Sequence, residues 1–258
     1  MTVPGTFDTS ARELIHAGLQ NLDEARSLFR QLSASGFDAA RCGLLLDALQ
    51  HVCDPDVALR NLVDIVNAQV SQGRALDDIM PDDTAFRQLV AVLGVSDAMG
   101  KLMRFRPDLV QAAAIDHCNS HLYNHDQRRA HVLESVGADP NDRMSPTATM
   151  DLADAATALR RTYRNQLAAI IAQDTMSDDP IALQPRISSE LSDLADAALE
   201  GALAIARHEI AGSEHCRFAI IGMGKLGARE LNYVSDVDLI YVVKAADADT
   251  RQHALYPI

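Results

Sequence analysis

The chain has 258 residues, 48% of them hydrophobic and 23% charged, which is enough for one large globular domain or two ordinary ones. Alanine and leucine are abundant, aromatic residues make up only 4%, and tryptophan is absent, a composition that favours helices. The formal net charge of −13 argues against an extended contact with nucleic acid, because such a contact needs a basic surface.

The sequence predicts a cytoplasmic protein without a membrane segment. Its first eight residues lack the basic start and apolar core of a signal peptide. No apolar run approaches the roughly 18 residues of a membrane span. The cysteines have no paired spacing, as expected for reduced thiols; they are Cys42, Cys53, Cys118 and Cys216.

From about residue 8 to residue 212 the pattern predicts helices almost throughout, with breaks at 35–36, 54–55, 73, 80–81 and 106–107. Asp54, Asp82 and Ser96 are expected to be N-caps, because acidic residues or proline follow them in the first helical turn. The loosely patterned segment 137–144 is the clearest candidate for a linker.

Two long helices are predicted after this linker. Ser145 is a potential cap with Pro146 at the first helical position, so the first helix should run from there to about residue 174. Its apolar stripe consists of Leu152, Ala156, Leu159, Tyr163, Leu167 and Ile170. The second helix should follow Pro185 and pack antiparallel to the first, across a connection at 177–184.

The period then changes to that of strands. Residues 217–221 and 237–243 are rich in β-formers and are predicted to be buried strands, with at most two helical turns between them at 226–232. Because a two-stranded ribbon is marginal alone, this module should be incomplete. The predicted fold is mainly α with an α+β end: a helical region at 1–144, a long helical pair at 145–212 and an incomplete domain at 213–258.

The segment Gly222-Met-Gly-Lys-Leu-Gly227 satisfies the G-x-G-x-x-G pattern of dinucleotide-binding folds. Such a fold needs a crossover helix and an acidic residue about 20 positions further on. Here Asp236 follows Gly227 by only nine residues, so the spacing is too short. A Walker A loop is also excluded, because Lys225 is followed by Leu226 and not by serine or threonine.

Asp236 and Asp238 flank a valine, and alternation along a strand would point both carboxylates the same way. Paired acids beside a turn rich in backbone N–H groups indicate Mg²⁺ and a nucleotide phosphate. Gly224-Lys225, followed after ten residues by Asp-Val-Asp, resembles nucleotidyltransferases of the polymerase-β type. The resemblance implies the start of such a core at 213–258.

In this core Asp236 and Asp238 would be the catalytic metal ligands, and a third carboxylate would come from a later strand, which is expected to lie beyond the chain. The nucleotide-binding candidates are Gly222, Gly224, Lys225 and Ser235. Ser235 could contact a phosphate or only cap the turn, and Lys225 could contact a phosphate or remain solvated.

The longer run 222–240 resembles the bifunctional glutamine synthetase adenylyltransferase/adenylyl-removing enzymes. Segment 159–172 is similar to the arginine-rich helix before that family's core, and 103–109 to a weaker landmark, so the likeness covers about 85–245. Ala228 replaces a glycine often found there, and Val234 replaces a small residue. Family members carry two transferase modules, and the initial methionine with its helical lead-in suggests the amino-terminal part.

The resemblance implies that this module removes AMP from a tyrosine of glutamine synthetase by phosphorolysis, which yields ADP, while the other module adds AMP from ATP. It implies Mg²⁺ or Mn²⁺ as cofactor, ATP or ADP with phosphate as nucleotide substrate, and glutamine synthetase and a PII-type signal protein as partners. Two alternatives stay open: another enzyme of this fold, such as a PII uridylyltransferase or an RNA-tailing enzyme, and a helical docking module with a silent site.

A cluster of metal-ligating side chains occurs elsewhere, at His117, Cys118, His121 and His125, with His131 nearby. Positions i and i+8 lie about 12 Å apart along a helix axis, too far for one ion. The sequence therefore predicts a solvated histidine-rich face and no zinc site.

Overall fold

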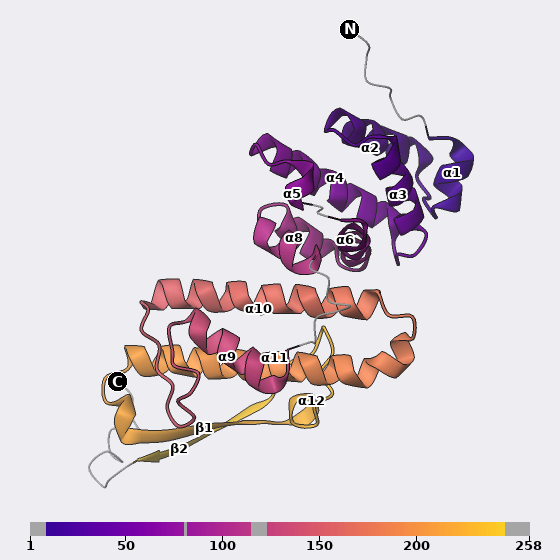
Figure 1. Ribbon diagram of the computed structural model, residues 1–258. Coiled ribbons are helices and arrows are strands. Elements are labelled where there is room, and N and C mark those ends of the chain that lie inside the picture. Colours follow the sequence, from indigo (N-terminus) through magenta and orange to yellow (C-terminus); the bar gives the residue numbers. More distant parts are fainter. Residues whose placement is uncertain (1–8, 80–81, 115–122, 246–258) are drawn as a thin grey trace. The chain divides into compact units, whose positions relative to one another are not determined.

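The computed structural model describes residues 9–79, 82–114 and 123–245 (Figure 1). Contacts divide the chain into two compact units, the first formed by 1–120 with 171–180 and the second by 121–170 with 181–258. The three-part division at residues 144 and 212 stays a prediction. None of the described helices has both the length and the apolar character needed to cross a membrane.

The first unit is built of helices alone among its described residues. Its centre is formed by helices α4 and α6, whose buried faces include the fully buried Leu59, Leu62, Leu89 and Leu93. The helices are α1 (Ala11–His16), α2 (Leu22–Ala34), α3 (Ala39–Leu49), α4 (Pro55–Ser71), α5 (Leu76–Ile79), α6 (Asp83–Val95), α7 (Asp97–Met103) and α8 (Pro107–Ala114).

All three predicted N-caps of this unit are confirmed. The side chain of Asp54 accepts the backbone N–H of Val57 at 2.9 Å. The side chains of Asp82 and Ser96 cap α6 and α7 in the same way, at 2.8 and 3.2 Å. Helices α2 and α4 end at the predicted breaks, where a glycine takes a positive φ. The break at 80–81 lies outside the described residues.

The second unit combines a β-hairpin with helices, among them most of the two long helices α10 and α11; residues 171–180, where α10 ends, belong to the first unit (Figure 1). Buried residues of α10 pack on α11 in reverse order: Ala155 shares a cluster with Ala204, and Ile170 shares one with Ile187. The predicted antiparallel pairing is therefore confirmed. The elements are α9 (His125–Ser135), α10 (Leu152–Thr175), α11 (Pro180–Glu209), the 3-10 helix η1 (Ser213–His215), β1 (Cys216–Gly222), α12 (Gly224–Gly227) and β2 (Leu239–Ala245).

The predicted start of the first long helix at Ser145 is wrong, because α10 begins at Leu152. The backbone N–H of Ser145 donates to the carboxylate of Asp142 at 3.0 Å, and the N–H of Ala148 donates to the carbonyl of Ala204 at 3.0 Å. The first bond closes a local turn, and the second holds the segment against α11 in a non-helical conformation. The Ser-Pro pair is thus part of a connection between α9 and α10.

The second long helix also begins elsewhere than predicted, at Pro180, and it continues through Pro185. Proline removes one N–H and crowds the carbonyl four residues earlier, here that of Ile181. The residue Ile181 is 87% exposed, so water can reach this carbonyl. The cost of an internal proline is therefore reduced near this helix end.

The strands β1 and β2 pair antiparallel, from Cys216 opposite Ala245 to Gly222 opposite Leu239. Antiparallel pairing is incompatible with the parallel crossover of a dinucleotide-binding fold, which removes that alternative. The prediction of buried strands is wrong: Tyr241 is 61% exposed, and Ile221, Ile240, Val242 and Val243 are also exposed. The other described residues pack over only part of the hairpin, so its β-branched side chains reach solvent.

Candidate functional site

The glycine turn follows β1 and lies beside the start of β2. Gly222 is the last residue of β1, and the next N–H, that of Met223, donates to the carbonyl of Asp238 at 2.8 Å. Gly224 has a φ of +54°, and a Cβ placed on it would lie 3.3 Å from Oδ2 of Asp238. The structure therefore brings the Asp238 carboxylate against Gly224, two residues that the sequence separates by fourteen positions.

The turn itself is closed backbone to backbone. A Cβ on Gly227 would lie only 2.6 Å from the carbonyl oxygen of Gly222. Leu226 is 3% exposed and anchors the turn in the core below it. Among the described residues no acceptor contacts the N–H groups of Gly224 and Lys225. Both are therefore free to bind an anion such as a phosphate.

The loop after α12 presents the remaining predicted residues. Ser235 accepts the N–H of Asn232 at 3.2 Å and donates to the Oδ1 of Asn232 at 2.8 Å, so its hydroxyl closes the turn before Asp236. Asp236, Asp238 and Lys225 are exposed, and both aspartates precede β2. Their carboxylate oxygens are donors of the kind that Mg²⁺ prefers. Phosphate binding by Ser235 and Lys225 stays a prediction.

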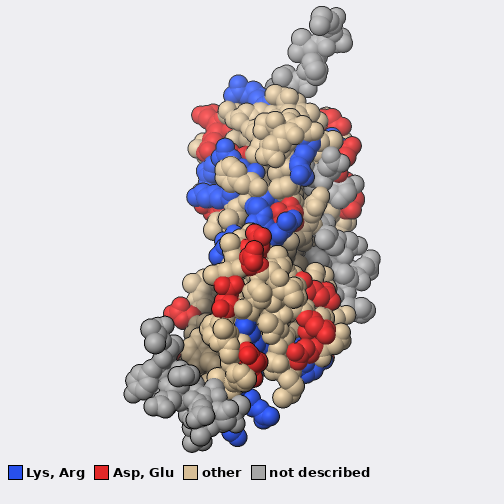
Figure 2. All heavy atoms as spheres, turned by 90° about the vertical axis from the view of Figure 1, so that its left-hand side faces the viewer, with Lys and Arg blue, Asp and Glu red and all other residues tan. Residues whose placement is uncertain are grey.

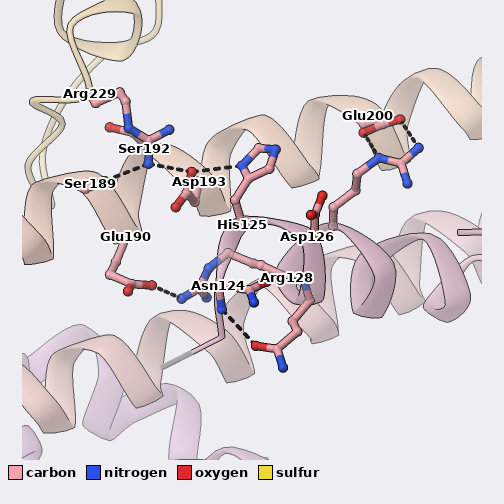
Figure 3. A network of polar contacts seen from close by, with 12 residues as sticks. Asn124, His125, Asp126, Arg128, Ser189, Glu190, Ser192, Asp193, Glu200 and Arg229 are labelled. Carbon is pink, nitrogen blue, oxygen red and sulfur yellow. Dashed lines mark hydrogen bonds and ion pairs between the residues drawn. The ribbon is translucent and has the colours of Figure 1, made fainter. Parts of the chain in front are cut away.

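One face of α11 contacts this loop through polar side chains. Four polar residues share that face at three- and four-residue steps: Ser189, Ser192, Asp193 and Asp196. Arg229 donates to Ser189 Oγ at 2.6 Å and forms an ion pair with Asp193 Oδ1 at 2.8 Å (Figure 3). Sequence reasoning missed this set. Its only local signal was the helical spacing of polar residues within an otherwise apolar helix.

The same carboxylate also contacts α9. His125 Nδ1 lies 2.9 Å from Oδ1 of Asp193 (Figure 3). Potential ligand atoms of His125, Asp193 and Asp196 all lie within 4.8 Å of one another, but Arg229 already supplies a positive charge there. Burial raises the pKa of the Asp196 carboxyl, and the neighbouring Asp193 contributes in the same direction. The His-rich face is described only at His125 and His131; residues 117, 118 and 121 lie outside the described residues.

A buried ion pair fixes α9 against the two long helices. Arg128 is 1% exposed; it pairs with Glu190 of α11 and donates to Gln166 of α10 at 2.8 Å. Arg129 next to it makes two bonds of 2.7 Å to Glu200 of α11. This frame sets the position of His125 at the start of α9 and of the polar face of α11.

A cleft of about 680 Å³ runs between β1 and α11 and reaches the glycine turn at Gly222 and Gly227. Its strand side is apolar, with Phe218 and Ile220, and its other side includes Arg207 of α11. Burial lowers the pKa of Arg207, whose guanidinium donates to the carbonyl of Pro146 at 3.1 Å. The cleft therefore offers apolar surface and guanidinium groups, and part of its lining belongs to the turn.

Comparison with known proteins agrees with this arrangement. The sequence model of the family glutamate-ammonia ligase adenylyltransferase matches residues 86–254. A bifunctional glutamine synthetase adenylyltransferase/adenylyl-removing enzyme of Bifidobacterium longum (strain DJO10A) is 66% identical over 249 residues, 96% of this chain and 23% of that protein. Proteins with the same name from Leifsonia xyli subsp. xyli and Cutibacterium acnes are 36% and 32% identical over 91% and 92% of this chain. No solved structure matches the chain.

The chain spans only 23% to 24% of the length of these curated relatives. The matched region nevertheless contains the glycine turn, both aspartates and the polar face of α11. The family named in these comparisons is the one that the run 222–240 resembles. The chain belongs to the glutamate-ammonia ligase adenylyltransferase family.

Proposed function

We propose that this chain carries the glycine turn and two metal-binding aspartates of an adenylyl-removing site that acts on glutamine synthetase. The observation that carries the proposal is the position of the Asp238 carboxylate against Gly224, where the antiparallel hairpin ends. Nucleotidyl transfer needs carboxylates and phosphate-binding amides at one point, and here they belong to adjacent ends of two strands.

Each residue of the site has a distinct role in this proposal. Asp236 and Asp238 would hold Mg²⁺ or Mn²⁺, which supplies charge neutralisation at the phosphates and alignment for an in-line displacement. The free N–H groups of Gly224 and Lys225, together with the Lys225 ammonium, contact phosphate oxygens. Because Gly222 has no Cβ, the side chain of Leu226 can pack against it. Ser235 orders the loop before Asp236.

The proposed reaction is phosphorolysis. An oxygen of inorganic phosphate attacks the phosphorus of AMP on the tyrosine, the bond from that phosphorus to the tyrosine oxygen breaks, and ADP leaves. The tyrosine oxygen then takes a proton from solvent. The exposed position of the aspartates suits this reaction, because a side chain on the surface of another protein must reach them.

Glutamine synthetase is proposed as the substrate because the names of the relatives contain it. A PII-type signal protein as a second partner, ATP or ADP as the nucleotide, and a cytoplasmic location belong to the same proposal. Nucleic acid is not proposed as a substrate. The net charge is −13, and acidic side chains lie among the basic ones on the face shown in Figure 2.

The test uses the full-length protein that contains this chain, with Asp238→Asn as the variant and Asp154→Asn as the matched control. Asp154 is an exposed aspartate of α10, far along the chain from the turn. Release of ADP from adenylylated glutamine synthetase is measured with phosphate and Mg²⁺. We expect Asp238→Asn to lower the rate at least about 100-fold, as for loss of a group that acts on the transition state, and Asp154→Asn to leave it unchanged.

Two results would overturn the proposal. If the full-length protein adds AMP from ATP but releases no ADP, the adenylyl-removing assignment is wrong. If Asp238→Asn releases ADP at the normal rate, a different part of the protein performs the chemistry, and this chain is a docking module with a silent site.

A further inference from the structure

The loop that leads from the glycine turn to the aspartates contains a residue in an unfavourable backbone conformation. Arg229 has a φ of +60°, and among the described residues no other non-glycine residue has a positive φ. For an arginine this conformation costs about 1 kcal/mol or more. Something must therefore hold the loop in place at this position.

The side chain of Arg229 supplies the holding contacts. It is bound to two residues of α11 at once, to Ser189 Oγ at 2.6 Å and to Asp193 Oδ1 at 2.8 Å. Two residues further on, the N–H of Leu231 lies 3.4 Å from Ser192 Oγ, and the Leu231 side chain is buried. The segment 229–231 is thus fixed to one face of α11 by side chain and backbone together.

This attachment is transmitted to the glycine turn through short backbone bonds. The N–H of Arg229 donates to the carbonyl of Leu226 at 3.0 Å, and the N–H of Glu230 donates to the carbonyl of Lys225 at 2.8 Å. A displacement of Arg229 must therefore move the turn that contacts Asp238 or break these bonds.

Asp193 is a buried residue of α11 and is therefore suited to hold Arg229 in place. Its side chain is only 9% exposed, and it lies between Arg229 on one side and His125 of α9 on the other (Figure 3). A buried carboxylate that loses a cationic partner is left undercompensated, which is strongly unfavourable. The loop position is consequently coupled to the charge on Asp193.

We propose that Arg229 is a positioning residue: its ion pair with Asp193 holds the glycine turn and the following aspartates in the geometry needed for nucleotidyl transfer. The proposal rests on the function proposed above for the turn. Arg229 does not contact Asp238, so it acts through the loop and not on the reacting atoms.

The variants are Arg229→Gln, Arg229→Lys and Asp193→Asn in the full-length protein, with Arg26→Gln as the control. Arg26 is also an arginine paired with an aspartate, Asp23, but both belong to α2 of the first unit and the Arg26 side chain is 40% exposed. Arg229→Gln and Asp193→Asn should lower kcat for ADP release between about 10- and 100-fold, the scale of a misplaced catalytic group. They should also raise the Mg²⁺ concentration needed for half-maximal rate. Both contacts of Arg229 come from Nη2 alone, so Arg229→Lys, which keeps the charge and several donors on one nitrogen, should recover part of the loss.

Hydrogen exchange followed by mass spectrometry provides a readout independent of activity. Amides of 223–231 should exchange faster in Arg229→Gln and Asp193→Asn, while the peptides of α10 should exchange as in the wild type. The double variant Arg229→Gln with Asp193→Asn should lose less than the two single variants together, because both remove the ion pair between Arg229 and Asp193.

The outcomes separate this proposal from the function on which it rests. If the wild type releases no ADP but the loop amides respond as described, the function is wrong and the attachment is real. If Arg229→Gln keeps a normal kcat, Mg²⁺ response and exchange, the positioning role is wrong. Stoichiometric binding of Mn²⁺ that is lost in His125→Ala and kept in Asp238→Asn would also overturn it, since a cation would then replace Arg229 at Asp193.

Discussion

Replacing Gly227 by alanine tests how tightly the glycine turn closes on the end of β1. The added Cβ would lie 2.6 Å from the carbonyl oxygen of Gly222 and 3.3 Å from its carbon. Real Cβ atoms essentially never come closer than 3.0 Å, so the two atoms must separate by about 0.4 Å or more. The obstacle is backbone, so no change of rotamer can relieve it.

Forced expansion of a packed site typically costs about 1–3 kcal/mol. Alanine has a better helix propensity than glycine by up to about 1 kcal/mol, but Gly227 ends a helix of only four residues, so this gain is small. We therefore expect Gly227→Ala to destabilise the second unit by about 1–2 kcal/mol in urea unfolding, since the overpacking term dominates. The Met223 to Asp238 bond lies at the same strand end, so hydrogen exchange at 222–231 should also accelerate.

The control is the same substitution at Gly43, in the middle of α3, where an added Cβ meets nothing within 4 Å. There the alanine should stabilise the first unit by about 0.5–1 kcal/mol. If Gly227→Ala unfolded at the wild-type urea concentration with unchanged exchange at 222–231, the close backbone approach would not exist in solution and the reasoning would be refuted.

Three further predictions concern a buried ion pair, a helix cap and a carboxyl whose pKa is raised. Glu190→Gln should destabilise the second unit by about 3–5 kcal/mol in urea unfolding, because Arg128 would remain buried without its ionic partner; an effect below 1 kcal/mol would contradict the buried pair. Asp54→Ala should cost about 1 kcal/mol of first-unit stability through loss of the α4 cap, whereas Asp54→Asn should cost little, and circular dichroism in urea distinguishes them. The pKa of Asp196 is raised in the fold, so its carboxyl contributes most to stability below the unfolded pKa and loses that contribution as pH rises through the folded one. Asp196→Asn should therefore stabilise the protein near neutral pH and much less in acid; a stability difference from wild type that does not depend on pH would contradict the assignment.

Features that depend on a few neighbouring residues were predictable from the sequence. The caps at Asp54, Asp82 and Ser96 involve residues three positions apart, so no distant part of the chain can easily override them. The meeting of Gly224 and Asp238 is also nearly local, since the hairpin that joins them is short and the spacing excludes a crossover helix.

Features that depend on distant partners were not predictable. Ser145 and Pro146 have the pattern of a helix start, but the bond from Ala148 to Ala204 prevents it, and no local pattern reveals a partner 56 positions away. The attachment of Arg229 to Asp193 was missed for the same reason. Both contacts join α11 to a segment distant in sequence, so predicting them requires the position of α11 in the fold.

The spacing of charges along α11 limits how this protein can change in length. The neighbouring residues Arg128 and Arg129 of α9 form ion pairs with Glu190 and Glu200 of α11, respectively. Asp193, which lies between these two acids in the sequence, forms an ion pair with Arg229. One inserted or deleted residue rotates everything beyond it by about 100°. An insertion between Asp193 and Glu200 would therefore turn one of these contacts away from its partner even if every side chain were kept. Substitution can adjust this helix gradually, whereas a change of its length cannot.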